Sequence, residues 1–410
     1  MGESESFDAV VVGASLAGCT AATVLARKGA RVAVVDRASS PSAYKKVCTH
    51  YIQPSALPTL ERLGLMDRIR DAGGVKSPIW FHTRFGWVDP PEGFDGLNFR
   101  REKLDPMVRG LAGETKGVEL RMGHGVKELL RDGDRVAGVV TEKDGERQEL
   151  RAQIVVGADG RHSKVAELAG VEGKTAPNNR FLYAAYFKNL ALAVKDGSTI
   201  WFGVDAAYVF PGDDDVTVVV VMPHKDKLPA FRADLEKSFY AQFDGLPRAP
   251  KLRDAERLGD FFGMLELPNH VRPAAVGRVA LVGDAAMTSD PVMGVGCGFA
   301  LQSGEWLGED VGPALAAGKG VDEALATYAK HHDERLRMHH DMINDISLAK
   351  PFNPIERLIF HGAAVDDDFA RKVVLLNSRS KHPKEILGPG LLARALWLRL
   401  TKRAPPEQRA

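Results

Sequence analysis

The sequence contains few cysteines. Its 410 residues include 3 of them, Cys19, Cys48 and Cys297, which are far apart and form no Cys-x-x-Cys pair. Disulfide-stapled secreted domains and structural zinc sites need cysteines in greater number or at closer spacing. We therefore expect neither a disulfide framework nor a metal site, and we expect the protein to work in a reducing compartment.

Long apolar runs and a strong charge imbalance are also missing. The chain has no stretch of about 18 consecutive apolar residues, and residues 1–10 lack the basic and apolar regions of a signal peptide. Basic and acidic residues nearly balance, 55 against 54, which leaves a net charge of +1 and argues against a nucleic-acid partner. We expect a cytoplasmic protein without stable membrane insertion that acts on a small molecule. The sequence does not indicate an oligomeric state.

The chain is long enough for two or three domains, and no internal repeat interrupts it. Its beginning is organised as a strand, a glycine-rich turn, a helix and a second strand. Residues 9–12 are a β-branched run typical of a strand buried on both faces, and residues 13–18 read GASLAG. A second apolar strand over residues 31–35 ends in Asp36. This order predicts a βαβ unit that binds a dinucleotide.

Each characteristic position of this motif has an expected physical role. Gly13 would make the tight turn, Gly18 would allow close helix–strand packing, and Asp36 would accept a hydrogen bond from a ribose hydroxyl. Ser15 stands where the motif has its middle glycine, and its Cβ would crowd a pyrophosphate that approaches the backbone. The unit as a whole still predicts dinucleotide binding, because strand, helix, second strand and carboxylate are in register.

Two later segments repeat the pattern of an apolar strand that ends in glycine and aspartate. Residues 154–156 lead to Asp159, and residues 279–282 lead through Gly283 to Asp284. A doubly wound sheet presents its ligand-binding groups at the carboxyl ends of such strands. We therefore expect both carboxylates to lie near the predicted dinucleotide site.

A glycine-containing loop follows the last of these strands. Residues 287–298 include Gly294, Gly296 and Gly298, and we expect a helix over residues 299–316. Backbone N–H groups exposed at a helix N-terminus favour an anion or an electron-rich carbonyl.

The middle of the chain has a different pattern. Residues 181–222 are apolar strands separated by tight turns, without the helices that would connect parallel strands. Residues 79–98 are rich in aromatic side chains and proline, which predicts further short strands. We therefore predict an antiparallel sheet that forms a second domain inserted into the first.

Taken together, the segments GASLAG, VVGADGRHS and RVALVGDAAMTSDPVMGVGCG resemble the three motifs of FAD-dependent oxidoreductases of the aromatic-hydroxylase type. Flavin-dependent halogenases and geranylgeranyl reductases share this motif set. The resemblance spans residues 7–330. It implies an α/β fold: a Rossmann-like FAD-binding domain, an inserted antiparallel-sheet substrate domain and a C-terminal helical segment. It further implies FAD contacts at Gly13, Ser15, Ala17, Gly18, Asp36, Arg37, Lys46, Arg101, Asp159, Gly283, Asp284, Pro291, Gly294, Val295 and Gly296.

The activity that the resemblance implies is monooxygenation. NAD(P)H would reduce FAD, O2 would form a flavin C4a-hydroperoxide, and one oxygen atom would pass to a small aromatic or polyketide-like substrate. No second complete GxGxxG motif is present, so NAD(P)H would bind transiently or a separate reductase would supply electrons.

Departures from the family pattern keep other reactions open. Met287 replaces the usual histidine after GDAA, and Lys46-Val47-Cys48 resembles the K-x-C-G stretch of geranylgeranyl reductases although Thr49 follows. Reduction of isoprenoid double bonds is therefore the alternative. A halogenase is less favoured because the W-x-W-x-I-P segment is absent, and a flavin carrier without catalytic activity is the third possibility.

Four other features of the sequence each allow two interpretations. His50 is a weak candidate for a catalytic residue, because a lone histidine is more often a surface or satisfied polar side chain. Lys46 fits either a cofactor contact or a solvated loop. For residues 331–340 we expect an ordinary solvated helix face over a metal site, because His332 and His339 would lie too far apart along a helix to share one ion. Residues 391–400 predict a basic amphipathic helix that packs on the protein or touches a membrane surface.

The expected domain limits follow these patterns. FAD-binding parts are expected at residues 1–75, 101–175 and 273–330, substrate-domain parts at 76–100 and 176–272, and a C-terminal helical region at 331–410.

Overall fold

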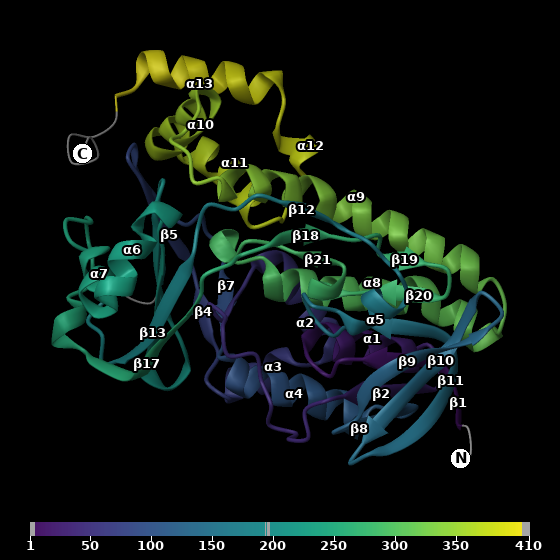
Figure 1. Cartoon of the computed structure of the whole chain (residues 1–410). Helices are drawn as coiled ribbons and strands as arrows, with labels where there is room; N and C mark the ends of the chain where they lie inside the picture. The colour runs from purple at the N-terminus through teal and green to yellow at the C-terminus, as the bar shows by residue number, and fades with distance from the viewer. Residues whose placement is uncertain (1–4, 193, 195–196, 404–410) are drawn as a thin grey trace.

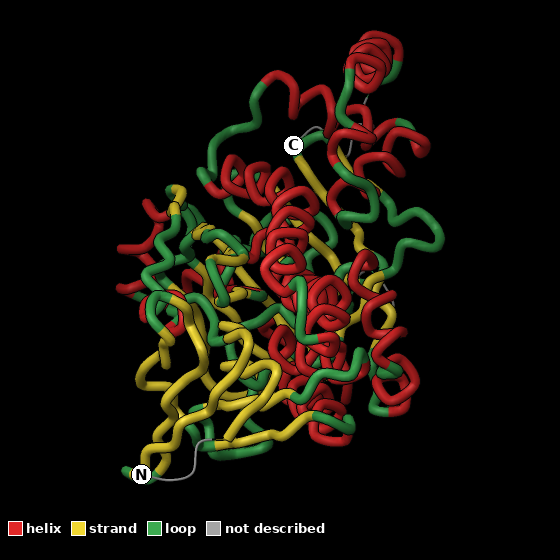
Figure 2. The backbone as a smooth tube through the Cα atoms, turned by 90° about the vertical axis from the view of Figure 1, so that its right-hand side faces the viewer, coloured by secondary structure: helices red, strands yellow, loops and turns green. Residues whose placement is uncertain are grey.

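The computed structural model describes residues 5–192, 194 and 197–403 of the chain. Figure 1 shows a mixed sheet with covering helices on the right, an antiparallel sheet on the left and the last helices of the chain along the top. In the orthogonal view of Figure 2, helices stack along one side of the strands. This arrangement confirms the predicted α/β fold class.

The mixed sheet is built around the first strand of the chain. Strand β1 (Glu5–Val12) pairs in parallel with β2 (Val32–Asp36) on one side and β11 (Glu146–Gly157) on the other. Residues 9–11 of β1 are fully buried, as a strand covered on both faces requires. The sheet runs β19 (Ala275–Val276), β20 (Val279–Leu281), β11, β1, β2 and β8 (Val118–Met122), and β10 (Arg135–Lys143) and β9 (Gly125–Asp132) extend it from β11.

Helices α1 (Leu16–Arg27) and α8 (Gly296–Ala317) pack together on this sheet. Their backbones approach so closely that a Cβ added to Gly304 would lie 2.5 Å from the Ala17 carbonyl oxygen. Helix α4 (Arg101–Glu114) also contacts α1, and α9 (Val321–Ser347) packs against α8. These contacts hold the N-terminal ends of α1 and α8 near the carboxyl ends of β1 and β20.

The antiparallel sheet supplies the opposite half of the molecule. It runs β17 (Glu256–Met264), β13 (Leu182–Lys188), β16 (Val216–Met222), β15 (Ala206–Pro211), β14 (Ser198–Phe202), β5 (Ile79–Thr83) and β6 (Gly86–Val88), so the two segments predicted as strands join in one sheet. Only the β14–β5 pair is parallel among the pairings of this sheet in the described residues. Helices α6 (Leu228–Ala233) and α7 (Leu235–Ala241) pack on one face through Phe231 and Phe239. The other face turns toward the N-terminal part of α8.

Shorter elements connect the two halves. One small sheet runs β3 (Tyr51–Ile52), β7 (Gly96–Asn98) and β4 (Val75–Ser77), and another runs β12 (Lys174–Ala176), β18 (Asn269–Val271) and β21 (Met287–Thr288). The remaining helices before the C-terminal region are α2 (Leu57–Leu63), α3 (Met66–Asp71) and α5 (Lys164–Leu168).

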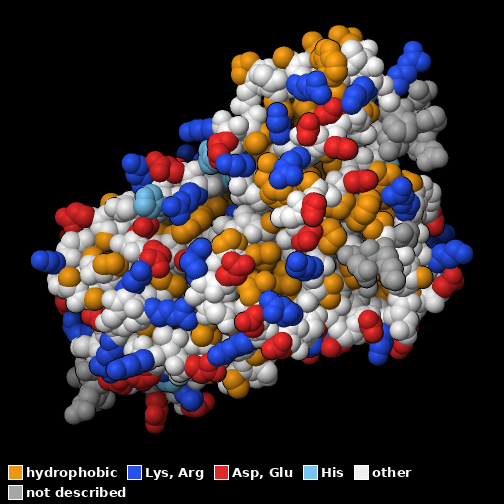
Figure 3. Space-filling model, turned by 180° about the vertical axis from the view of Figure 1, so that it is seen from behind, with side chains coloured by type: hydrophobic (Ala, Val, Ile, Leu, Met, Phe, Trp, Pro, Cys, Tyr) orange, Lys and Arg blue, Asp and Glu red, His pale blue; other side chains and the backbone are white. Residues whose placement is uncertain are grey.

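The C-terminal helices cover the upper edge of the molecule. They are α10 (Pro354–Val365), α11 (Asp367–Asn377), α12 (Pro383–Ile386) and α13 (Pro389–Thr401). Helix α13 buries Leu391, Ala395 and Leu398 against this region, as the packing alternative predicted, while its other face exposes apolar side chains that contribute to the hydrophobic surface at the top of Figure 3. No helix among the described residues is long and apolar enough to cross a membrane.

Candidate functional site

The turn after β1 brings backbone close to backbone. Gly13 has φ +112°, and a Cβ added there would lie 2.4 Å from the Ala158 carbonyl oxygen. A Cβ at Gly18 would lie 1.9 Å from the Gly13 carbonyl oxygen, so no larger residue fits at either position without movement of the chain. Because α1 begins directly after this turn, its first N–H groups lack intrahelical partners and can bind an anion.

Asp36 holds the same turn from the end of β2. One carboxylate oxygen accepts from the Ala14 backbone N–H at 2.6 Å, and the other accepts from the Ala38 N–H at 2.7 Å. The carboxylate therefore fixes the shape of the glycine-rich turn, and its remaining lone pairs are available to a ribose hydroxyl. The neighbouring Arg37 is exposed.

Ser15 is accommodated by a buried ion pair beneath the turn. Arg101 donates to both carboxylate oxygens of Asp105, at 2.6 and 2.9 Å, and to the Ser15 hydroxyl at 2.9 Å. The side chains of Arg101 and Asp105 are 5% and 1% exposed. The hydroxyl that replaces the middle glycine is thus a hydrogen-bond partner of Arg101. Asp105 was missed by the sequence analysis, although its spacing of four residues from Arg101 on one helix is a recognisable signal.

The lysine that faces the site is Lys45. Its ammonium group lies 2.8 Å from an Asp284 carboxylate oxygen, and its backbone N–H donates to Asp105 at 2.9 Å. The charge of Asp284 raises the pKa of Lys45 above its ordinary value. Lys46, the lysine predicted as a cofactor contact, is exposed and is not among the residues that line the cavity described below.

The turn after β20 also packs closely against α1. A Cβ added to Gly283, which has φ +57°, would lie 2.9 Å from the Ala17 side chain, so this turn lies against α1. The chain then passes through the short 3-10 turn Pro291–Met293, Gly294 with φ +64°, and Val295 into α8. Gly296 begins the helix, and a Cβ built there meets no atom within 4 Å. The start of α8 at Gly296 therefore borders open space.

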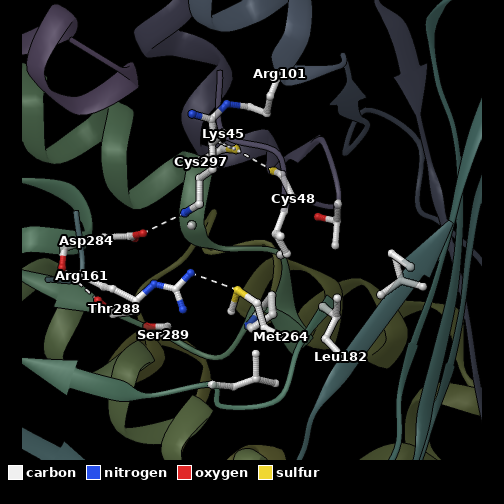
Figure 4. Close-up of a pocket in the computed structure, with 18 of the residues that line it drawn as sticks. Lys45, Cys48, Arg101, Arg161, Leu182, Met264, Asp284, Thr288, Ser289 and Cys297 are labelled. Carbon is white, nitrogen blue, oxygen red and sulfur yellow. Dashed lines mark hydrogen bonds and ion pairs between the residues drawn. The ribbon is translucent and has the colours of Figure 1, made fainter. Parts of the chain in front are cut away.

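One cavity joins these groups to the antiparallel sheet (Figure 4). Its polar wall comes from the mixed-sheet half, whereas its other wall consists of apolar side chains on β13, β16 and β17. The polar wall includes Lys45, Cys48, Arg101, Asp284, Gly294, Gly296 and Cys297, and the apolar wall includes Leu182, Ala184, Val220, Phe262 and Met264. Arg161 also lines the cavity and lies with a guanidinium nitrogen 3.0 Å from the Met264 sulfur.

His50 lies behind the polar wall. The Arg101 backbone N–H donates to its Nδ1 at 3.1 Å, so the neutral ring carries its proton on Nε2 and donates to the Tyr186 hydroxyl at 2.7 Å. Its backbone has φ +63°, a left-handed conformation that is uncommon for a residue with a side chain. The structure therefore gives His50 a defined partner on β13, and the residue is not one of those that line the cavity.

Asp159 makes its hydrogen bonds within the segment that leads into α5. Its carboxylate accepts from the Ser163 hydroxyl at 2.5 Å and from the Val165 backbone N–H at 3.1 Å. These contacts cap the beginning of α5. A role of Asp159 toward a cofactor stays a prediction.

The expectation of a solvated helix face over residues 331–340 is wrong at His332 and His339 of α9, which pack into the protein. His332 and His339 are 3% and 7% exposed, and burial lowers the pKa of each to about 4. In the part of the chain that the structure describes, no group of three or more His, Cys, Asp or Glu side chains is placed to hold a metal ion.

These residues fit FAD on structural grounds. The glycine turns at Gly13 and Gly283 let the backbone pack closely against the start of α1, the start of α8 at Gly296 borders open space, and Arg101 and Lys45 supply positive charge. The adenosine half would lie at the end of β2 near Asp36, and the reactive ring would face the cavity beside Gly294 and Gly296.

Several known proteins are similar to this chain in sequence or in fold. The chain is 26% identical to violacein synthase of Chromobacterium violaceum over 329 residues, which cover 72% of this chain and 75% of that protein. It is 27% identical to digeranylgeranylglycerophospholipid reductase of Methanosarcina mazei over 326 residues, 77% of each protein. The solved structure of the flavin-dependent brominase Bmp2 has the same fold, with a TM-score of 0.79, 18% identity, and coverage of 97% of this chain and 100% of that chain.

The family model described as "FAD binding domain" matches residues 6–238, more than half of the chain. That span contains the β1–α1–β2 unit, Arg101 and Asp159, and it extends into the antiparallel sheet. The chain therefore belongs to the FAD binding domain family and is an FAD-dependent oxidoreductase.

Proposed function

We propose that this protein is an FAD-dependent monooxygenase that uses NAD(P)H and O2 to oxygenate a small aromatic or polyketide-like substrate. The observation that supports the proposal is the cavity with two unlike walls. Its polar wall carries the expected FAD contacts, and its apolar wall carries Leu182, Phe262 and Met264. An apolar substrate held there would lie against the reactive ring.

The chemistry of oxygen transfer explains why such a wall is useful. FAD supplies the activation of O2, and the protein must place the substrate beside the ring and keep water away from it. Leu182, Ala184 and Val220 cannot hydrogen-bond water through their side chains, so this side of the cavity favours an apolar ring over solvent. In this proposal the polar residues hold FAD and the sheet holds the substrate.

A second candidate function is reduction of an isoprenoid double bond. The side chains of the apolar wall carry no hydrogen-bonding N or O atom, which suits a pure hydrocarbon chain as well as an aromatic ring. One relative bears the name of a reductase of digeranylgeranylglycerophospholipid, and its alignment covers 77% of both proteins. This candidate needs a reduced flavin and a substrate, but no O2.

Oxygen dependence separates the two functions. NADH and NADPH oxidation would be followed together with O2 uptake on the purified, FAD-loaded protein, with phenolic, polyketide and isoprenoid compounds added singly. Substrate-stimulated O2 uptake and a product heavier by one oxygen atom support the monooxygenase. Substrate reduction without O2, giving a product heavier by two hydrogen atoms, overturns it in favour of the reductase. Parallel reactions without substrate measure the background oxidation.

A further inference from the structure

Two of the three cysteines meet in the cavity. Cys48 lies in the segment before β3, and Cys297 lies in the first turn of α8, yet their sulfur atoms are 3.8 Å apart across a separation of 249 residues. Both line the same cavity, and Figure 4 shows their side chains pointing toward each other. The third cysteine, Cys19, is buried within α1.

The surroundings of the two sulfurs differ. The two sulfurs share a hydrogen bond, and this contact with Cys297 lowers the pKa of Cys48. The His50 backbone N–H donates to the Cys48 sulfur at 3.2 Å. The hydrogen bond to Cys48 and burial raise the pKa of Cys297. The Arg101 guanidinium, 3.9 Å from the Cys297 sulfur, adds positive charge beside the pair. Cys48 is therefore the sulfur favoured as a thiolate, and Cys297 is its protonated partner.

The distance between the two sulfur atoms suits a disulfide bond that forms and breaks reversibly. A disulfide has a sulfur–sulfur distance of about 2.05 Å, so the two sulfurs must approach by less than about 2 Å. Cys48 is half-buried in an irregular segment and lines the cavity through which a small oxidant would reach it. Cys297 is anchored on a long helix and is buried. Cys48 is thus the sulfur that a small oxidant meets first.

We propose that Cys48 and Cys297 form a redox-active thiol pair that hydrogen peroxide converts into a disulfide. The Cys48 thiolate attacks one peroxide oxygen, the O–O bond breaks, and Cys48 becomes a sulfenic acid while hydroxide leaves and takes up a proton as water. The Cys297 sulfur then attacks the Cys48 sulfur, the sulfenic oxygen leaves as a second water, and the disulfide remains. Each thiol loses one hydrogen, and one peroxide is reduced to two waters.

This pair goes beyond the proposed function and does not depend on which substrate the cavity binds. A disulfide would remove the thiolate beside Arg101 and would tie the segment that carries Lys45 to the start of α8. Both changes fall where FAD is expected to lie. The oxidised protein should therefore bind FAD differently from the reduced protein.

The test is a thiol count on the full-length protein, with and without FAD. After treatment with a small excess of hydrogen peroxide under native conditions and removal of the oxidant, thiols are titrated in denaturant. The count should fall from 3 to one. The intact mass should fall by two hydrogen atoms, a digest should yield a peptide that joins Cys48 to Cys297, and dithiothreitol should reverse all three changes.

Matched variants separate the roles of the sulfurs. Cys19→Ser should still form the disulfide. Cys297→Ala should stop at a sulfenic acid on Cys48 that dimedone traps, and the pH midpoint for alkylation of Cys48 should rise because the donor from Cys297 is gone. Retention of all three thiols in the folded wild-type protein, or separate oxidation of the cysteines without a joined peptide, would overturn the proposal.

Discussion

Replacing Asp105 by asparagine removes the charge that neutralises Arg101 beneath the glycine-rich turn. The two side chains are 5% and 1% exposed and make two hydrogen bonds, at 2.6 and 2.9 Å. Removing one partner of a buried ion pair costs about 3–5 kcal/mol, because the other charge is left without compensation. Asp105→Asn should therefore lower the free energy of unfolding by that amount. The amide would also bring N–H donors against the Lys45 backbone N–H, which now donates to the carboxylate.

Urea unfolding of flavin-free protein measures this cost, since bound FAD would add its own stabilisation. Glu114→Gln is the matched control: it neutralises the carboxylate of an exposed pair with Arg68, whose side chains are 49% and 60% exposed, and should cost about 0–1 kcal/mol. The double variant Arg101→Met with Asp105→Leu should recover much of the loss, because an apolar pair replaces both charges. Equal costs for Asp105→Asn and Glu114→Gln would refute the reasoning.

Three further predictions test other parts of the site and fold. Gly18→Ala should abolish FAD retention, measured by flavin absorbance, because the added Cβ would lie 1.9 Å from a carbonyl oxygen. Gly110→Ala is the control: its Cβ would meet no atom within 4 Å, so it should raise the free energy of unfolding in urea by about 0.5–1 kcal/mol. Lys45→Met should weaken FAD binding about 10-fold or more, through loss of a charge-assisted contact, and Lys46→Met should leave the affinity nearly unchanged. Fluorescence titration with FAD measures both affinities, and a larger loss in Lys46→Met would contradict this prediction. Burial lowers the pKa of His332 to about 4 against about 6.5 when unfolded, so the unfolded chain binds the proton first as the pH falls. His332 alone should contribute a loss on the order of 3 kcal/mol of stability between pH 6.5 and 4, and His332→Leu should lack this component in urea unfolding across that range.

The parts of the fold that depend on local pattern could be predicted from the sequence. The β1–α1–β2 unit follows from a β-branched run, glycines at the turn and a helical pattern, all within a short segment. The strand β9 (Gly125–Asp132) was missed because its polar, exposed residues lack a clear alternation, and it is held by pairing with β10. The beginning of α8 was predicted at Phe299 and lies at Gly296, because glycine is a weak helix former and tertiary packing decides the start.

Several contacts in the candidate site could not be predicted from the sequence. Lys45 and Lys46 are neighbours in an irregular segment, and no periodicity indicates which of the two faces Asp284. Helix α4 begins at Arg101, which places that arginine four residues from Asp105 on one helix. The approach of Cys48 to Cys297 depends on the packing of the whole domain.

The central claim is that FAD occupies the cavity between the mixed sheet and the apolar wall. The most direct measurement is the visible spectrum of the purified protein after reconstitution with FAD, combined with identification of the flavin released on denaturation. The account predicts flavin absorbance with one FAD per chain, and loss of that flavin in Gly18→Ala. A protein that folds but binds no FAD after reconstitution would contradict the account.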